Sequence, residues 1–423
     1  MLSMLRWSES TGVMHSFVLA LVYGVGGFFA LLLAIIIVSK AWREFVEARL
    51  RRRRVELEPA LFKYVVGKGP IANFLPRPIK RGERLLVEQV FFELGRVVKG
   101  SVHDRARDAF EQLGFVDFYL SSIGSRRWWT RAEAAEKLGL MGSEKATTAL
   151  IEHMSDPVPD VRVRAARALG NIRTSEALRP LALALKDPGR WSAIRVAGIL
   201  IGAGDESVEI LLTEFDKFPQ HARISAIDIF GRIRSLKAIG LLRDLLRHKD
   251  ADTRARAAFA LGLIGDPTSS PHLATALADP AWFVRAMAAK ALGRLKEDGS
   301  IPALCSALAD PQWWVRANTA EALKNKGGRG MGALLSMLDS KDAYAAQQAV
   351  SMLQDSGVLD AMISRLGSED SVERQQALDV MAKLVRLKRT DLLTEMAHNH
   401  PENSIRQRLG IILGLRIQPH PTA

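Results

Sequence analysis

Arginine and small apolar side chains recur along this chain with a single period. The stretch RAMAAKALG, which begins at Arg285, shows the pattern: small side chains stand three and four residues after the arginine, followed by leucine and glycine. The pattern returns every 30 or 31 residues, and its arginines are Arg131, Arg162, Arg223, Arg254, Arg285 and Arg316. Repetition at this period predicts an α-solenoid, because each short unit can bury its apolar face only against copies of itself.

Aspartate followed by proline punctuates the same units. The four pairs are Asp156-Pro157, Asp187-Pro188, Asp279-Pro280 and Asp310-Pro311. Aspartate is favoured as a helix N-cap, and proline fits the first helical position. We therefore expect each pair to start the second helix of its unit. Leucine-rich stretches at 178–185, 239–246 and 273–277 predict first helices, so the fold class is all-α.

The chain divides by pattern into several segments. Prolines and glycines between residues 56 and 82 predict a linker. Residues 83–124 are expected to form irregular N-terminal capping helices, residues 125–416 the repeat solenoid, and residues 417–423 a tail. Within the solenoid, Ala193 and Gln347 stand where the repeated arginine would be, and the last units lack Asp-Pro.

The repeats resemble HEAT repeats, specifically the short phycobilisome-lyase-like (E-Z type) class. The resemblance rests on the order Asp-Pro, Val-Arg, Ala-Ala and Leu-Gly, which is matched best over 156–170, 279–293 and 310–323. It extends over about 125–349 and continues weakly at 375–384 and 406–413. The resemblance implies helical pairs stacked in an array. It says little about function, because one fold serves many functions.

An apolar segment precedes the repeats. No charged residue lies between Glu9 and Lys40, and residues 17–38 are almost continuously apolar. A helix of that length reaches across the ~30 Å hydrocarbon core of a bilayer. The sequence therefore predicts a transmembrane helix over 17–39, after a short extracytoplasmic N-terminus over 1–16. A cleaved signal peptide is the alternative, but the positive charge follows the apolar run instead of preceding it.

Basic residues gather directly after that segment. The net charge is +13, and residues 40–81 hold twelve Lys or Arg against four Glu. Such charges stay on the cytoplasmic side of a span, which predicts a single-pass protein of the inner cell membrane with a cytoplasmic solenoid. Residues 40–82 are then a basic juxtamembrane segment and linker, with these residues at the membrane interface: Trp42, Arg43, Arg49, Arg51, Arg52, Arg53 and Arg54. Nucleic-acid binding is the alternative use of such a block.

Small residues are spaced four apart within the apolar segment. They are Ala20, Gly24, Gly26, Ala30 and Ala34. This spacing lets another helix approach closely, so a second integral membrane protein is one expected partner. The alternative is that alanine and glycine are simply common in such segments.

Large aromatic residues occupy the same two adjacent positions in several repeats. They stand just after the Asp-Pro position: Trp128, Trp129, Trp191, Trp282, Phe283, Trp313 and Trp314. Tryptophan is enriched among interface anchors, so these residues are candidates for binding a protein partner. The alternative is an aromatic seam between units that never contacts a partner.

The arginine ladder has two interpretations. Arginine forms bidentate pairs with carboxylates, and in HEAT-like families such a ladder usually joins neighbouring units through Asp or backbone carbonyls. The other interpretation is a binding track for an acidic partner. We expect the structural role.

Catalytic and metal-binding patterns are absent from the sequence. None of the nine histidines is followed by Glu, the single cysteine is Cys305, and no Walker-type or Gly-x-Ser-x-Gly motif occurs. We expect no enzyme activity, no metal and no cofactor. The predicted function is a membrane-anchored scaffold that recruits or positions a protein partner. The alternatives are a bilin-lyase-like enzyme, a ligand-sensing regulator and, with less support, a nucleic-acid binder.

Overall fold

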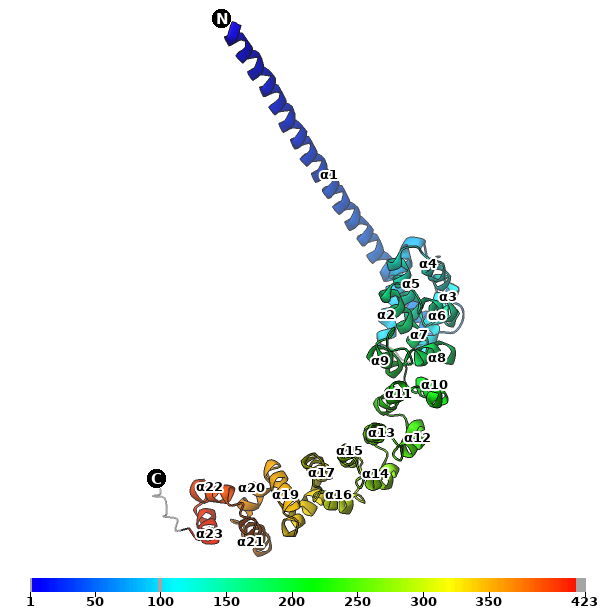
Figure 1. Ribbon diagram of the computed structural model, residues 1–423. Helices are drawn as coiled ribbons and strands as arrows, with labels where there is room; N and C mark the ends of the chain where they lie inside the picture. Colours follow the sequence, from blue (N-terminus) through cyan, green and yellow to red (C-terminus); the bar gives the residue numbers. More distant parts are fainter. Residues whose placement is uncertain (1, 98–100, 416–423) are drawn as a thin grey trace. The chain divides into compact units, whose positions relative to one another are not determined.

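The computed structural model describes the backbone of residues 2–97 and 101–415, and throughout these residues the secondary structure is helical (Figure 1). The side chains of residues 2–20, 22, 24–26, 30, 81, 94–97 and 101–103 are not described. The chain forms two compact units, residues 1–164 and 165–423. Each unit is described below by itself.

Unit 1 begins with the long helix α1 (Leu2–Val66). The helices that follow it are α2 (Arg84–Val97), α3 (Ser101–Gln112), α4 (Phe115–Ile123), α5 (Trp128–Met141), α6 (Thr147–His153) and α7 (Pro159–Ile172), which ends in unit 2. The last turns of α1 pack on α2 and α3 and bury Leu57, Leu61 and Tyr64. The Tyr64 hydroxyl donates a hydrogen bond to the Arg105 carbonyl at 3.1 Å. This packing continues the helix through Pro59 into residues where the sequence predicts a linker.

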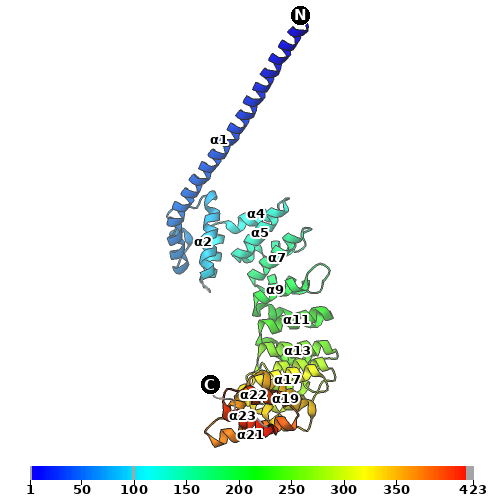
Figure 2. The ribbon, with the colours of Figure 1, turned by 90° about the vertical axis from the view of Figure 1, so that its left-hand side faces the viewer.

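Unit 2 is a stack of helical pairs (Figure 2). Its helices are α8 (Ser175–Ala184), α9 (Ala193–Ala203), α10 (Asp205–Glu214), α11 (Gln220–Ile233), α12 (Ile239–Leu245), α13 (Ala251–Ile264), α14 (Ser270–Ala276), α15 (Trp282–Leu292), α16 (Ile301–Ala307), α17 (Trp313–Asn325), α18 (Gly327–Ser336), α19 (Ala343–Asp355), α20 (Val358–Arg365), α21 (Ser371–Arg386), α22 (Asp391–Asn399) and α23 (Asn403–Leu413). Successive second helices α11, α13, α15, α17 and α19 pack on one another, and the first helices α12, α14, α16 and α18 pack on their own partners. The all-α solenoid expected from the repeat is confirmed.

The second helices start later than the Asp-Pro pairs predict. Helix α15 begins at Trp282 with Ala281 as its N-cap, and α17 begins at Trp313 with Gln312 as its N-cap. The Asp279 carboxylate instead accepts a hydrogen bond from the Ala281 amide at 2.9 Å, within the turn. Asp-Pro therefore shapes the turn before the helix.

The glycines that close two of the repeat motifs, Gly262 and Gly293, are required by close packing. A Cβ atom on Gly262 would lie 2.6 Å from the Cα atom of Ala291, and one on Gly293 would lie 2.6 Å from the Cα atom of Ala322. Non-bonded carbon atoms do not approach that closely, so only glycine lets successive second helices pack at this distance.

The structure corrects the expected membrane location. Across the residues with described side chains, none of the helices is apolar over a length that would carry it through a bilayer. The prediction of a single-pass inner-membrane protein with its N-terminus outside is therefore wrong, and the transmembrane helix over 17–39 has no support.

The residues assigned to that membrane segment lie along α1. Ala20, Gly24, Gly26 and Ala30 fall outside the described side chains, and Ala34 is exposed. The expected interface role of Trp42, Arg43, Arg49, Arg51, Arg52, Arg53 and Arg54 depends on the span and is withdrawn with it. Arg53 is buried, and its guanidinium pairs with Glu56 at 2.8 Å and with Glu83 at 3.4 Å.

Candidate functional site

Some of the repeated arginines, including Arg131 and Arg254, bridge consecutive repeats. Arg254 donates two parallel hydrogen bonds to Asp279, Nε to Oδ2 at 2.7 Å and Nη2 to Oδ1 at 2.8 Å. The side chains of both residues are almost completely covered. In unit 1, Arg131 makes the same bidentate pair with Asp156, at 2.7 and 3.0 Å. Hydrogen bonds from Arg131 lower the pKa of Asp156.

Other arginines of the ladder hold the turn before their own helix. Nη1 of Arg162 donates to the carbonyls of Asp156 and Pro157, and Nη1 of Arg316 to those of Asp310 and Pro311, all at 2.8–3.1 Å. Arg223 donates to the carbonyls of Phe215 and Asp216. These contacts engage the guanidinium groups within the array.

Sequence reasoning missed two members of this ladder. Nη1 of Arg374 donates to the Ser368 carbonyl at 2.8 Å, and Nη1 of Arg406 donates to the His400 carbonyl. Gln347 interrupts the series, and the distance along the chain from Gln347 to Arg374 departs from the regular period. The sequence pattern therefore does not reach Arg374, and Arg406 begins only a weak match to the repeat.

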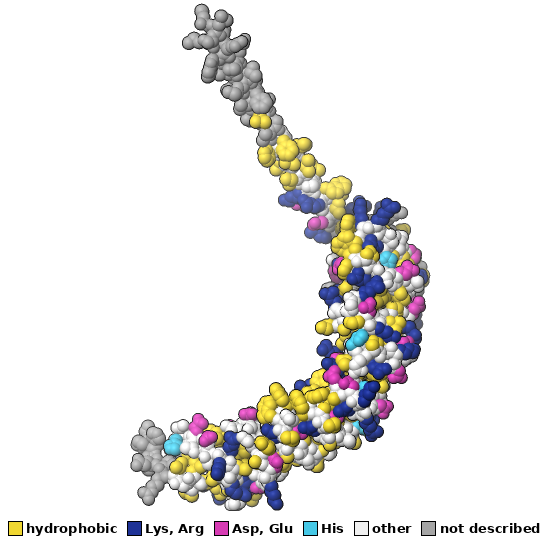
Figure 3. Space-filling view, in the orientation of Figure 1, with side chains coloured by type: hydrophobic (Ala, Val, Ile, Leu, Met, Phe, Trp, Pro, Cys, Tyr) yellow, Lys and Arg dark blue, Asp and Glu magenta, His cyan; other side chains and the backbone are white. Residues whose placement is uncertain are grey.

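Exposed aromatic side chains form a row along the N-termini of α15, α17 and α19. We define the aromatic row as Trp282, Trp313, Trp314 and Tyr344, whose side chains are 42, 54, 57 and 55 % exposed. The rings of Trp313 and Trp314 meet edge to face with centroids 4.8 Å apart. Figure 3 shows hydrophobic side chains gathered on the face of unit 2 near α17. The sequence pattern did not single out Tyr344, whose ring centroid lies 4.6 Å from the guanidinium carbon of Arg316.

The other predicted aromatic residues lie in different surroundings. Trp128 and Trp129 begin α5 in unit 1 and are exposed, with the Arg127 guanidinium 5.9 Å from the Trp129 ring. Trp191 precedes α9 and is only 9 % exposed, so it belongs to the core. Phe283 is half-buried beside Trp282, with ring centroids 5.8 Å apart.

A groove runs across α11, α13 and α15 in unit 2. We call it the α13 groove; its volume is about 450 Å³. Its apolar lining includes Phe259, Leu263, Phe283 and Met287, and its charged lining consists of Asp228, Arg232, Asp252 and Arg256.

One arginine crosslinks the acidic residues of the groove. Arg256 Nη1 lies 2.9 Å from Asp228 Oδ2, and Arg256 Nε lies 3.2 Å from Asp252 Oδ2. Burial raises the pKa of Asp228, although Arg256 acts in the opposite direction.

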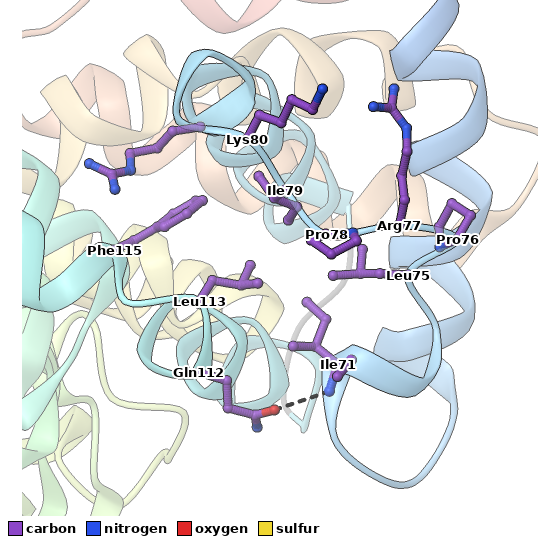
Figure 4. A pocket seen from close by; sticks show the side chains of 12 residues that line it. Ile71, Leu75, Pro76, Arg77, Pro78, Ile79, Lys80, Gln112, Leu113 and Phe115 are labelled. Atoms are coloured by element: carbon purple, nitrogen blue, oxygen red, sulfur yellow. Dashed lines mark hydrogen bonds between the residues drawn. The ribbon is translucent and has the colours of Figure 1, made fainter.

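Unit 1 contains a second cleft, of about 580 Å³, between the segment 71–80 and the start of α4 (Figure 4). Leu75, Ile79, Leu113 and Phe115 give it apolar walls. Figure 4 shows the charged ends of Arg77 and Lys80 directed away from Leu113. The Arg84 guanidinium instead lies 3.7 Å from the Phe118 ring centroid. The cations of this cleft therefore do not converge on one point.

Chemistry-bearing side chains are sparse elsewhere. Among the residues with described side chains, no group of three or more His, Cys, Asp or Glu is arranged to hold a metal ion. Cys305 is half-buried, and burial raises the pKa of its thiol.

Comparison with known families identifies the repeat. A family model described as HEAT repeats matches residues 116–201, 208–286, 242–324 and 271–354, which together exceed half of the chain. A search of curated proteins gives no match.

A search of solved structures gives matches of low sequence identity. An engineered protein is 18 % identical, with a TM-score of 0.35 over 71 % of this chain and 98 % of its own. Human deoxyhypusine hydroxylase in complex with glycerol is 21 % identical, with a TM-score of 0.26 over 72 % and 97 %. The karyopherin Kap121p bound to the extreme C-terminus of the protein phosphatase Cdc14p is 13 % identical, with a TM-score of 0.41 over 79 % and 46 %. At these TM-scores the likenesses carry no argument about function.

Proposed function

This chain belongs to the HEAT-repeat family, and from that premise we propose that it is a binding scaffold and not an enzyme. Its partner is a protein that docks on the aromatic row of unit 2. The observation that carries this proposal is the exposure of four large aromatic side chains at the first two helical positions of three successive repeats.

The exposed rings of the aromatic row are suited to contact a protein partner. Large aromatic side chains supply much of the contact energy in protein interfaces and are enriched among hot-spot residues. Soluble surfaces rarely carry contiguous apolar patches without a binding role. Packing between α15, α17 and α19 holds the N-termini of these helices together, so the row is preorganised for a partner.

An aromatic seam between repeats would require the rings of one repeat to contact those of the next. Among the described side chains, Trp313 pairs with Trp314 and Trp282 pairs with Phe283, so each pair lies within a single repeat. No aromatic pair joins Trp282 to Trp313 in that same set. The arrangement therefore supports an interface better than a seam.

Site-specific photo-crosslinking tests the proposal. Benzoylphenylalanine replaces Trp314 in one variant and Leu236 in the control; Leu236 is exposed and precedes the first helix α12. We expect position 314 to crosslink one defined protein in the producing cells, and the product to disappear when Trp313→Ala is added. The same products at both positions, or none at position 314, would overturn the proposal.

A further inference from the structure

The α13 groove has the chemistry of a peptide-binding site. We propose that it binds a peptide segment in which one aromatic or large aliphatic side chain is flanked by carboxylates. This inference rests on the proposed function only in taking the partner to be a protein. The groove is separate from the aromatic row, and one residue pair, Trp282 and Phe283, connects the two.

The floor of the groove accepts an apolar side chain. Phe259, Phe283 and Met287 are each half-buried, so their remaining surface faces the groove and water. They come from α13 and α15, which pack against each other. Burying an apolar side chain against them removes apolar surface from water on both partners. Carbon-rich walls with few polar groups favour such an anchor.

Cations lie in and beside the groove. Arg232 is part of its lining. Beside the lining residue Phe259, the Lys290 ammonium lies 5.8 Å and the Arg294 guanidinium 4.9 Å from the ring centroid. In the part of the chain that the structure describes, none of these three exposed cations forms an ion pair, whereas Arg256 is held by Asp228 and Asp252. These three cations therefore remain free to meet the carboxylates of a ligand.

The arrangement favours a peptide over a nucleic acid. Asp228 and Asp252 stand on the same groove, and their negative charge opposes a continuous run of phosphates. A peptide places its carboxylates at separate points and can meet the cations while leaving the acidic wall free. Charge complementarity of this kind governs association rate and partner choice.

Fluorescence anisotropy with the full chain tests the inference. The probe is a short fluorescein-labelled peptide with a central phenylalanine between glutamates. One comparison peptide carries lysine for glutamate and another carries serine for phenylalanine. We expect the first peptide to bind about tenfold or more tightly than either of the others, with affinity falling as salt rises.

Charge reversal locates the binding site. Arg294→Glu should weaken binding of the acidic peptide by roughly tenfold or more, since a like charge then faces the ligand. Arg247→Glu makes the same change in net charge at an exposed residue after α12 and should leave binding unchanged. Circular dichroism of both variants checks that the helices are intact.

Three results would overturn the inference. They are equal affinity for the lysine peptide, unchanged affinity in Arg294→Glu, and displacement of the probe by an oligouridylate as effectively as by unlabelled peptide. If the probe fails to bind while position 314 still crosslinks its protein, the groove inference falls and the proposed function stands. If the probe binds as expected and the crosslinks are absent, the reverse holds.

Discussion

Arg285 and Asp310 join two consecutive repeats through two parallel hydrogen bonds, Nε to Oδ2 at 2.6 Å and Nη2 to Oδ1 at 2.9 Å. The third nitrogen, Nη1, donates to the carbonyls of Asp279 and Pro280 in the repeat that Arg285 itself belongs to. One side chain thus satisfies a carboxylate of the next unit and two carbonyls of its own. A planar guanidinium with donors on both edges can do this, and an ammonium group cannot.

Removing that guanidinium should destabilise unit 2. Arg285→Ala leaves the covered Asp310 carboxylate without its cation, and we expect a loss of about 2 kcal/mol. Urea denaturation followed by circular dichroism measures the change. Arg316→Ala is the matched comparison, because the hydrogen bonds of Arg316 go to backbone carbonyls and not to a carboxylate. The loss of stability in Arg316→Ala should therefore be smaller. Equal losses in the two variants would show that the carboxylate pair adds nothing.

Stability should fall in acid because of the aspartates in the ladder. Hydrogen bonds from Arg131 lower the pKa of Asp156. Burial alone would raise the pKa of Asp279 and Asp310, but hydrogen bonds from Arg254 and Arg285, together with those from backbone amides and the nearby arginine charges, lower the pKa of both. A lowered folded-state pKa means that the unfolded chain binds more protons in acid, so stability is full above the unfolded pKa of about 4 and is lost below it.

Urea midpoints measured between neutral pH and pH 3 would check this dependence. The wild-type midpoint should be flat near neutrality and should drop below about pH 4. Replacing Arg131 by Met removes the cause of the lowered Asp156 pKa, so the drop should become shallower. An unchanged slope in that variant would contradict the assignment.

A methyl group at Gly262 should disrupt the packing of α13 on α15. Its Cβ atom would lie 2.6 Å from the Ala291 Cα atom and 2.7 Å from the Ala291 Cβ atom, so backbone must move. We expect Gly262→Ala to destabilise by about 1–3 kcal/mol, despite the better helix propensity of alanine. Gly198→Ala in α9 meets no atom within 4 Å and should be neutral or stabilising. Thermal melting of both variants distinguishes packing from propensity, and a destabilisation of equal size in both would refute the packing explanation.

Much of the fold could be predicted from sequence because the repeat imposes the same packing many times. The starts of the helices were harder to predict. Asp279 accepts hydrogen bonds from a turn amide and from Arg254, and helix α15 begins only at Trp282. The end of α1 could not be predicted from local composition. Leu57 and Leu61 pack against α2 and α3 and keep the chain helical through Pro59, where composition alone indicates a break.

The candidate site could be predicted only in part from the sequence pattern. Register alone grouped Trp191 with Trp314, yet one is in the core and the other is exposed. The α13 groove combines residues of three helices, including Arg232, Phe259 and Phe283, and none of them is unusual in its own unit. Such a surface forms only when the units stack, so no single stretch of sequence predicts it.

The two tryptophans that share a register should respond oppositely to truncation. Trp191 is 9 % exposed, and Trp191→Ala should destabilise unit 2 by about 3–5 kcal/mol by opening a cavity. Trp314 is 57 % exposed, and Trp314→Ala should change stability by no more than about 0.5 kcal/mol while weakening partner binding. Urea denaturation by circular dichroism gives both values on the full chain. A large loss of stability in Trp314→Ala would place this residue in a structural seam and remove the main support for the aromatic row as an interface.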